Sequence, residues 1–125
     1  MKEKPKLLIV EDDDLTQDIY KKIFSKDFTL VACKNDEEFY TVLKMNLYQI
    51  FLIDLSLGSG VDGIQLMKDL RNMNEYASTP IMVVTAHAFN KDERNSKEAG
   101  ATMFFRKPID NKTLLREFKK ILSLE

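Results

Sequence analysis

The sequence predicts a doubly wound α/β domain, with a five-stranded parallel sheet and helices on both of its faces. Five short apolar runs recur at fairly even intervals, and segments with helical spacing separate them. The runs are continuous rather than alternating in polarity, which is typical of strands covered on both faces. Five repeats of a strand followed by a helix in so short a chain favour a parallel sheet joined by right-handed crossovers.

The predicted strands, in chain order, are the runs at residues 7–10, 29–32, 50–53, 81–84 and 102–105. Apolar residues three and four positions apart predict the helices between them, because that spacing lines one face of a helix. The spacing occurs within residues 15–23, 39–43 and 64–70, and it is clearest in the last segment, 114–122. Four of these helices are preceded by a residue suited to capping their first turn: Asp13, Asn35, Asp62 and Asp110.

Length and composition predict a single globular domain over residues 1–125, with no output domain among them. Of the 125 residues 44% are hydrophobic, and 19 basic against 20 acidic side chains leave a formal charge of −1. This balance argues against direct binding of nucleic acid, which calls for a basic surplus on one face. One cysteine, no long apolar run and no signal-peptide pattern predict a cytoplasmic protein that does not associate with membranes. We expect that cysteine, Cys33, to be buried as a small apolar residue.

Polar side chains follow four of the five predicted strands. They are Glu11 and Asp12 after the first strand, Asp54 after the third, Thr85 after the fourth and Lys107 after the fifth. In a doubly wound sheet the carboxyl ends of the strands form the ligand-binding edge, so we expect these groups to meet there. Three carboxylates repel one another, so either Mg²⁺ joins them or at least one keeps its proton to a higher pH than usual. Beside Mg²⁺, Asp54 is a candidate nucleophile toward a phosphoryl group, with Lys107 and Thr85 stabilising the phosphoryl oxygens.

Four short motifs surround these residues. They read Ile-Val-Glu-Asp-Asp after the first strand, Leu-Ile-Asp-Leu in the third, Val-Val-Thr-Ala in the fourth and Phe-Phe-Arg-Lys-Pro around the fifth. Each motif alone is weak, but their order and spacing are highly specific. By them the chain resembles the receiver domain of two-component response regulators over essentially its whole length. The resemblance implies the flavodoxin-like (βα)5 receiver fold.

The resemblance also implies a role for each matching residue at the acidic edge. Asp54 matches the phosphoacceptor, and Glu11 and Asp12 match the acidic pair that holds Mg²⁺, with Mn²⁺ as a second option, directly or through water. The backbone carbonyl of Ser56 would supply a further metal ligand. Lys107 matches the lysine that bridges the aspartate and its phosphoryl group.

Further positions match the residues that switch the domain and control the phosphoryl lifetime. Thr85 matches the switch hydroxyl, and Phe104 the aromatic residue that turns inward when that hydroxyl moves. Ser56 and His87 match positions that border the attacking water. Residues 90–98 are polar nearly all round, so as a helix they have little apolar surface to anchor them. We expect this fourth helix, the fifth strand and the last helix to form the face that rearranges on phosphorylation.

The implied function is that of a phosphoacceptor in a two-component phosphorelay. The partner would be a histidine kinase or a histidine phosphotransfer protein, and the domain would be a monomer or a weak dimer through the rearranging face. It would speed only its own phosphorylation and dephosphorylation, so it is not expected to be an enzyme with turnover. One alternative is a receiver-like interaction domain that acts without phosphorylation. Another is a phosphohydrolase using an aspartyl phosphate, which is less favoured because Ser56 stands where such enzymes carry an acid.

Overall fold

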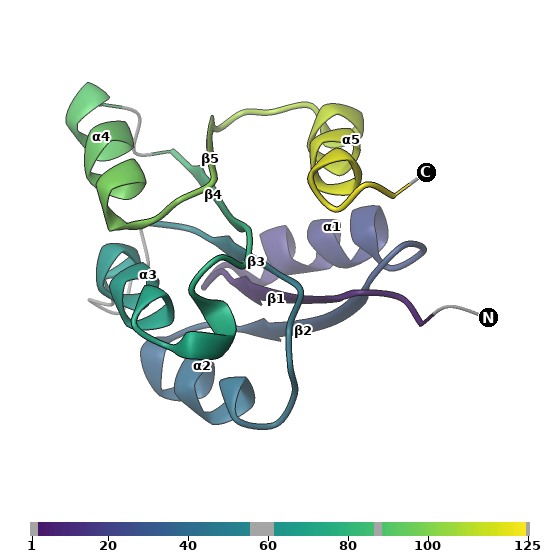
Figure 1. The fold of residues 1–125 in the computed structure, drawn as a ribbon. Coiled ribbons are helices and arrows are strands. Elements are labelled where there is room, and N and C mark those ends of the chain that lie inside the picture. Colours follow the sequence, from purple (N-terminus) through teal and green to yellow (C-terminus); the bar gives the residue numbers. More distant parts are fainter. Residues whose placement is uncertain (1–2, 56–61, 87–88, 125) are drawn as a thin grey trace.

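The computed structural model of the chain describes residues 3–55, 62–86 and 89–124, which form an α/β domain (Figure 1). Strands and helices alternate along most of the chain, as the sequence predicts. In chain order the elements are β1 (Lys6–Val10), α1 (Asp14–Phe24), β2 (Thr29–Cys33), α2 (Asp36–Leu43), β3 (Ile50–Ile53), α3 (Gly63–Arg71), the short 3-10 helix η1 (Asn74–Tyr76), β4 (Ile81–Thr85), α4 (Asn90–Ala99), β5 (Met103–Arg106) and α5 (Asn111–Ile121).

The described strands form a five-stranded parallel sheet in the order β2-β1-β3-β4-β5. This confirms the predicted fold class. No strand end differs from the prediction by more than one residue, and β5 is displaced as a whole by one residue toward the carboxyl terminus. The order of strands reverses between β1 and β3, where doubly wound sheets bind their ligands. Residues that follow β1 and β3 therefore lie side by side at the carboxyl edge.

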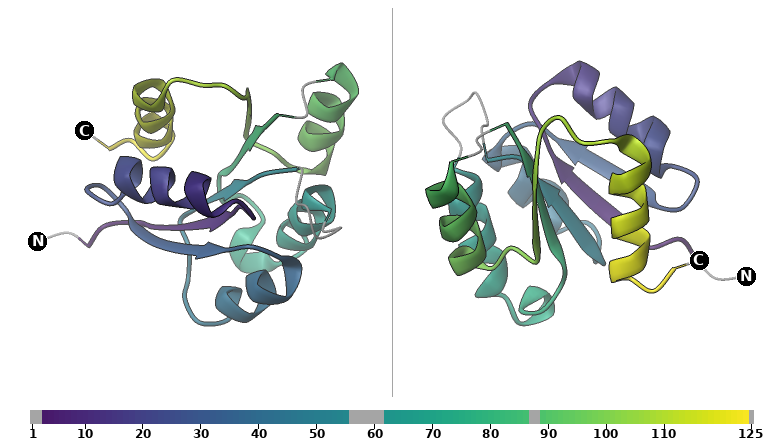
Figure 2. Two further views of the ribbon diagram at one scale, coloured as in Figure 1. Left: turned by 180° about the vertical axis from the view of Figure 1, so that it is seen from behind. Right: turned by 90° about the horizontal axis from the view of Figure 1, so that it is seen from above.

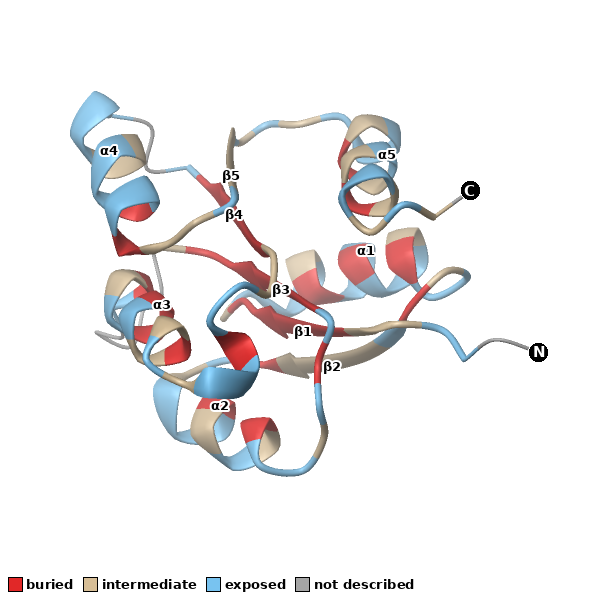
Figure 3. Cartoon of the chain, in the orientation of Figure 1, coloured by how far each residue is buried: buried red, intermediate tan, exposed pale blue. Residues whose placement is uncertain are grey.

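Helices cover both faces of the sheet. In Figure 2, α1 and α5 lie on one side of the strands, and α2, α3 and α4 lie on the other. An apolar cluster fills the space between helices and sheet on each face. Figure 3 shows the buried residues concentrated in the central strands β1, β3 and β4 and on the inward sides of the helices. No helix in the described part of the chain is both long enough and apolar enough to span a membrane.

All four predicted capping residues begin their helices. The side chains of Asp13, Asn35, Asp62 and Asp110 each accept a hydrogen bond from a backbone N–H of the first turn. Cys33 is buried as expected, with 1% of its surface exposed. Its burial raises the pKa of the thiol to about 12.

The inward face of α1 differs from the apolar spacing seen in the sequence. Leu15 is 68% exposed and Ile19 is exposed as well, whereas the buried residues of α1 are Gln17, Tyr20 and Phe24. Phe24 packs against the ring of Phe118 on α5, with centroids 4.7 Å apart. Aromatic rings bury more area than a leucine or isoleucine, so the ring contacts decide the rotation of the helix. This rotation leaves Leu15 and Ile19 on the surface.

The polar segment before β5 is the helix α4, as expected. It buries only Ser96 and Ala99 among its described residues. Gly100 ends α4 in the left-handed conformation with φ of 116°, which glycine adopts without steric cost. The small buried surface leaves α4 weakly anchored to the domain.

Candidate functional site

The candidate site lies at the carboxyl edge of the sheet, where β1 and β3 are neighbours. Glu11 follows β1 directly and Asp54 follows β3, and the N–H of Asp54 donates to the carbonyl of Val10 at 3.1 Å. This bond extends the pairing of the two strands to the acidic residues. Both are almost fully buried, with 2% of Glu11 and 3% of Asp54 exposed. The sheet thus brings two carboxylates together below the surface.

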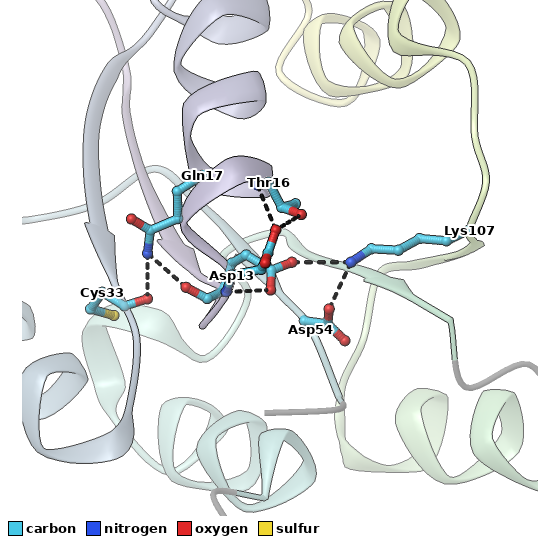
Figure 4. A network of polar contacts seen from close by, with 7 residues as sticks. Asp13, Thr16, Gln17, Cys33, Asp54 and Lys107 are labelled. Atoms are coloured by element: carbon cyan, nitrogen blue, oxygen red, sulfur yellow. Dashed lines mark hydrogen bonds and ion pairs between the residues drawn. The ribbon is translucent and has the colours of Figure 1, made fainter. Parts of the chain in front are cut away.

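Lys107 follows β5, and its side chain reaches across the carboxyl edge and contacts both carboxylates. Its Nζ lies 2.8 Å from Oδ2 of Asp54 and 3.0 Å from Oε1 of Glu11 (Figure 4). The backbone N–H of Lys107 donates to the carbonyl of Thr85 at 2.9 Å, so β4 fixes the start of this side chain. The structure therefore brings together Glu11, Asp54 and Lys107, three of the predicted site residues.

Burial and charge shift the proton affinities at the site. The pKa of Glu11 rises to about 7, first because the carboxyl is buried and then because the charge of Asp54 opposes its ionisation. This agrees with the expectation of a carboxyl that keeps its proton, although burial contributes more than repulsion. Burial alone would lower the pKa of Lys107, but its hydrogen bonds and ion pairs with Asp54 and Glu11 outweigh that effect and raise it. Lys107 therefore stays charged at neutral pH.

Gln17 holds the acidic turn at Glu11 and Asp12 in place by hydrogen bonds, and it was not predicted from the sequence. Its Nε2 donates to the carbonyl of Glu11 at 2.6 Å and to that of Cys33 at 3.2 Å. The turn is further closed by Asp13, whose N–H donates to Oε2 of Glu11 at 3.2 Å and whose carboxylate caps α1 through Thr16. The sequence does contain a signal for this role. Gln17 is a polar residue three positions before Tyr20, so it lies on the same face of α1 as the large aromatic residues.

The described residues contain no group of three or more His, Cys, Asp or Glu side chains arranged to hold a metal ion. Of the predicted ligands, Glu11 and Asp54 meet at Lys107, Asp12 follows Glu11 and is partly buried, and Ser56 lies outside the described residues. The carboxylate oxygens at this edge nevertheless suit a hard divalent cation. Mg²⁺ needs one or two carboxylates, because water and phosphate complete its coordination.

The predicted switch residues lie in β4 and β5. Thr85 ends β4 and is fully buried, beside Arg106 of β5 in the strand register. Phe104 is half-buried against the apolar cluster that includes Ala99 of α4, and the guanidinium of Arg106 lies 5.6 Å from the centre of its ring. Arg106 also pairs with Glu93 of α4 at 2.8 Å. His87, the remaining predicted residue, lies outside the described part of the chain.

A shallow groove of about 450 Å³ runs beside Lys107 on the α1 side of the edge. Ile19 and Tyr20 of α1 form one wall, and Pro108 and Ile109 form part of the other. The groove is mostly apolar. The buried site therefore borders an apolar groove.

Comparison with known proteins assigns the chain to a family. Residues 7–119 match the response regulator receiver domain. The chain is 31% identical over 119 residues to protein PetR of Rhodobacter capsulatus, an alignment that covers 94% of this chain and 48% of PetR. It is 27% identical over 118 residues to the regulatory protein VanRB of Enterococcus faecalis, covering 94% of this chain and 52% of that protein. The chain thus spans about half the length of these curated relatives.

Solved structures agree with this assignment. A putative response regulator from Chloroflexus aurantiacus superposes with a TM-score of 0.88 at 27% identity, covering 97% of this chain and 99% of that one. The receiver domain of a sensor histidine kinase from Pseudomonas aeruginosa, whose structure has a magnesium ion coordinated in the active site cleft, superposes with a TM-score of 0.85 at 20% identity over the same shares of the two chains. Sequence match, fold and the arrangement of strand-end residues agree, and the chain belongs to the response regulator receiver domain family.

Proposed function

We propose that the domain accepts a phosphoryl group on Asp54 from a phosphohistidine of a histidine kinase or a histidine phosphotransfer protein. Receiver domains of response regulators interact with histidine kinases and act as signalling domains. The observation that supports the proposal for this chain is the contact of Lys107 Nζ with Asp54 Oδ2 at 2.8 Å, in a site shared with Glu11. A buried carboxylate beside a charged ammonium is equipped to receive a phosphoryl group.

In the proposed reaction a carboxylate oxygen of Asp54 attacks the phosphorus. The P–N bond of the partner's phosphohistidine breaks, and its electron pair returns to the imidazole nitrogen, which takes up a proton from water. Lys107 stabilises the negative charge on the transferred group, because its ammonium already contacts Asp54. Thr85, the last residue of β4, would donate its hydroxyl to a phosphoryl oxygen. Phosphorylation would in this way change the contacts of β4.

Mg²⁺ is the proposed cofactor, with Mn²⁺ as a substitute. Glu11, Asp12, Asp54 and the backbone carbonyl of Ser56 would hold it, directly or through water. The cation would neutralise phosphoryl oxygens during transfer. Support comes from the oxygen-rich acidic edge, where the charge of Asp54 opposes the ionisation of Glu11. Ser56 and His87 would influence the lifetime of the acyl phosphate.

We propose that the signal leaves through the face formed by α4, β5 and α5. Phe104 and Arg106 of β5 lie next to α4, and the Arg106–Glu93 ion pair at 2.8 Å joins the two elements. Because α4 buries little, a change at Thr85 and Phe104 can move it at small cost. A downstream protein, or weakly a second copy of the domain, would bind this face.

Intact-mass measurement tests the acceptor. The domain is incubated with acetyl phosphate and Mg²⁺, and we expect one phosphoryl adduct on the wild-type protein. Asp54→Asn should lose the adduct, whereas Asp18→Asn, which removes an exposed carboxylate of α1, should keep it. An undiminished adduct on Asp54→Asn would show that the acceptor lies elsewhere.

Amide exchange tests the output face. We expect beryllofluoride, a phosphoryl mimic, together with Mg²⁺ to change the protection of residues 90–99, while α2 stays unchanged. Equal protection of α4 with and without the mimic would reject the proposed switch.

A further inference from the structure

Gln17 is a buried polar residue directly beneath the acidic turn. It lies in the second turn of α1 with 8% of its surface exposed, on the face that packs against the sheet. Its Nε2 contacts the carbonyl oxygens of Glu11 at 2.6 Å and Cys33 at 3.2 Å (Figure 4). Both partners can only accept, so the amide must present its NH2 group to them. The side chain therefore has a fixed orientation.

This amide joins β1 and β2 at the point where the two strands separate. The N–H of Glu11 donates to the carbonyl of Cys33 at 3.0 Å, which extends the strand pairing by one bond. Beyond it the chain after β2 turns away, because Asn35 caps α2. Gln17 then supplies a donor to the carbonyl of Glu11, a buried group that is costly to leave without a partner.

Fixing the carbonyl of Glu11 also fixes Asp12. The peptide group between the two residues is planar, so the direction of the Glu11 carbonyl sets the position of the Asp12 N–H and Cα. The Glu11 side chain is held separately, by Lys107 at 3.0 Å and by the N–H of Asp13 at 3.2 Å. Gln17 is thus the described side chain that orients the backbone between the two proposed metal-binding carboxylates.

We propose that Gln17 is a positioning residue for metal binding, whose amide sets the affinity of the Glu11–Asp12 turn for Mg²⁺. This inference rests on the proposed function, since it assumes that the turn binds Mg²⁺. Groups that hold metal ligands in place typically change metal affinity by about 10- to 100-fold when they are removed. Gln17 acts through the backbone rather than on a ligand atom, so we expect the lower end of that range.

The test compares two variants that each remove a side-chain donor to the backbone: Gln17 donates to two carbonyls, and the control residue donates to one. Gln17→Met keeps the length of the side chain and removes the donor. Tyr48→Phe removes the hydroxyl that donates to the carbonyl of Val42 at 2.7 Å, before β3 and away from the carboxyl edge. If Gln17→Met fails to fold, Gln17→Leu replaces it. Stability is measured by urea unfolding, and Mg²⁺ affinity by an NMR titration of the backbone amides.

We expect both variants to lose stability, but only Gln17→Met to bind Mg²⁺ about tenfold more weakly than the wild type. We also expect it to shift the Asp12 amide resonance in metal-free protein, which Tyr48→Phe should not do. Wild-type Mg²⁺ affinity in a folded Gln17→Met protein would overturn the inference. If the wild-type protein bound no Mg²⁺, both the proposed cofactor and the role of Gln17 in metal affinity would be rejected. An unshifted Asp12 resonance in Gln17→Met would separately reject the claim that Gln17 positions the turn.

Discussion

The guanidinium of Arg71 holds the carbonyl oxygen of Gly100, with Nε at 3.1 Å and Nη2 at 2.6 Å. The remaining nitrogen, Nη1, donates to the carbonyls of Tyr76 and Thr79. One side chain at the end of α3 therefore fixes the end of α4 and the segment that leads into β4. Burial lowers the pKa of Arg71 from its ordinary value, but an arginine remains charged under all ordinary conditions. Because α4 buries so little, this contact is a principal anchor for its carboxyl end.

Replacing Arg71 should destabilise the domain. Arg71→Met keeps much of the aliphatic stem and removes donors to three backbone carbonyls, so we expect a loss of about 2–3 kcal/mol in the free energy of unfolding. Arg71→Lys should recover little, because an ammonium cannot reproduce the planar fork. Urea unfolding measures both. Arg94→Met, on the exposed side of α4, is the control and should stay within about 0.5 kcal/mol of the wild type. A loss of similar size in both methionine variants would contradict the anchoring role.

Gly100→Ala should be costly for two reasons that can be separated. Its φ of 116° strains any other residue, and an added Cβ would lie 2.6 Å from Cγ and Nε of Arg71. We expect a loss of about 2 kcal/mol. In a double variant with Arg71→Ala, which removes both Cγ and Nε, the combined loss should be smaller than the sum of the two single losses, because the close contact disappears. Strict additivity in this cycle would show that backbone strain alone accounts for the cost.

Neutralising Glu11 should stabilise the metal-free protein at neutral and higher pH. The pKa of Glu11 is raised to about 7 in the fold, so its favourable contribution is full below the unfolded pKa and is lost as the pH rises toward 7. Above that pH the buried carboxylate is ionised and unfavourable. We expect Glu11→Gln to gain about 1–2 kcal/mol at about pH 8 and little at about pH 5, in EDTA. Glu37→Gln, on the exposed surface of α2, is the control. An equal gain at both pH values would contradict the shift.

Removing the ammonium of Lys107 should leave two buried carboxylates facing each other. We expect Lys107→Met to cost about 2 kcal/mol near pH 8, after allowance for the partial exposure of this side chain, and less near pH 5, where Glu11 takes up a proton. Adding Glu11→Gln should restore part of the loss. Thermal unfolding at the two pH values checks this.

The rate at which acetyl phosphate phosphorylates Lys107→Met should be about 100-fold lower than for the wild type. If the rate is unchanged, Lys107 does not stabilise the transferred group.

Cys33 should be nearly inert toward thiol reagents in the folded domain. At about pH 8 an ordinary thiol is about one quarter thiolate, whereas a pKa of about 12 leaves about 1 in 10,000 ionised. We expect no measurable reaction with dithionitrobenzoate over minutes, and complete reaction in urea. Ser78→Cys places a thiol on the exposed segment before β4 and should react at once. Rapid labelling of wild-type protein would show that β2 opens readily.

The fold was predictable because each of its main features has a local signal. Continuous apolar runs mark strands covered on both faces, and the four capping residues mark where helices begin. The rotation of α1 was not predictable from spacing alone. Leu15 and Ile19 follow helical periodicity as well as Tyr20 and Phe24 do, and packing of Phe24 on Phe118 decides between the two faces. That contact joins residues far apart in the chain.

The candidate site was predictable for a different reason. Parallel strands deliver the residues after them to one edge, so Glu11, Asp54 and Lys107 were expected to meet. Gln17 and Arg71 escaped notice because their partners are backbone carbonyls. A carbonyl belongs to every residue, so the sequence carries no mark of the place where a side chain will find one. Such contacts become visible only when the turn is folded.

The ion pair between Lys107 and Glu11 joins positions 96 residues apart. A nascent chain that has emerged only as far as β4 already carries both carboxylates but lacks the ammonium that balances them. The contact that balances the two carboxylates therefore needs the segment that follows β5. Under the proposed function, a copy that ends before Lys107 would lack the ammonium that stabilises the transferred group, so it should not take part in the relay.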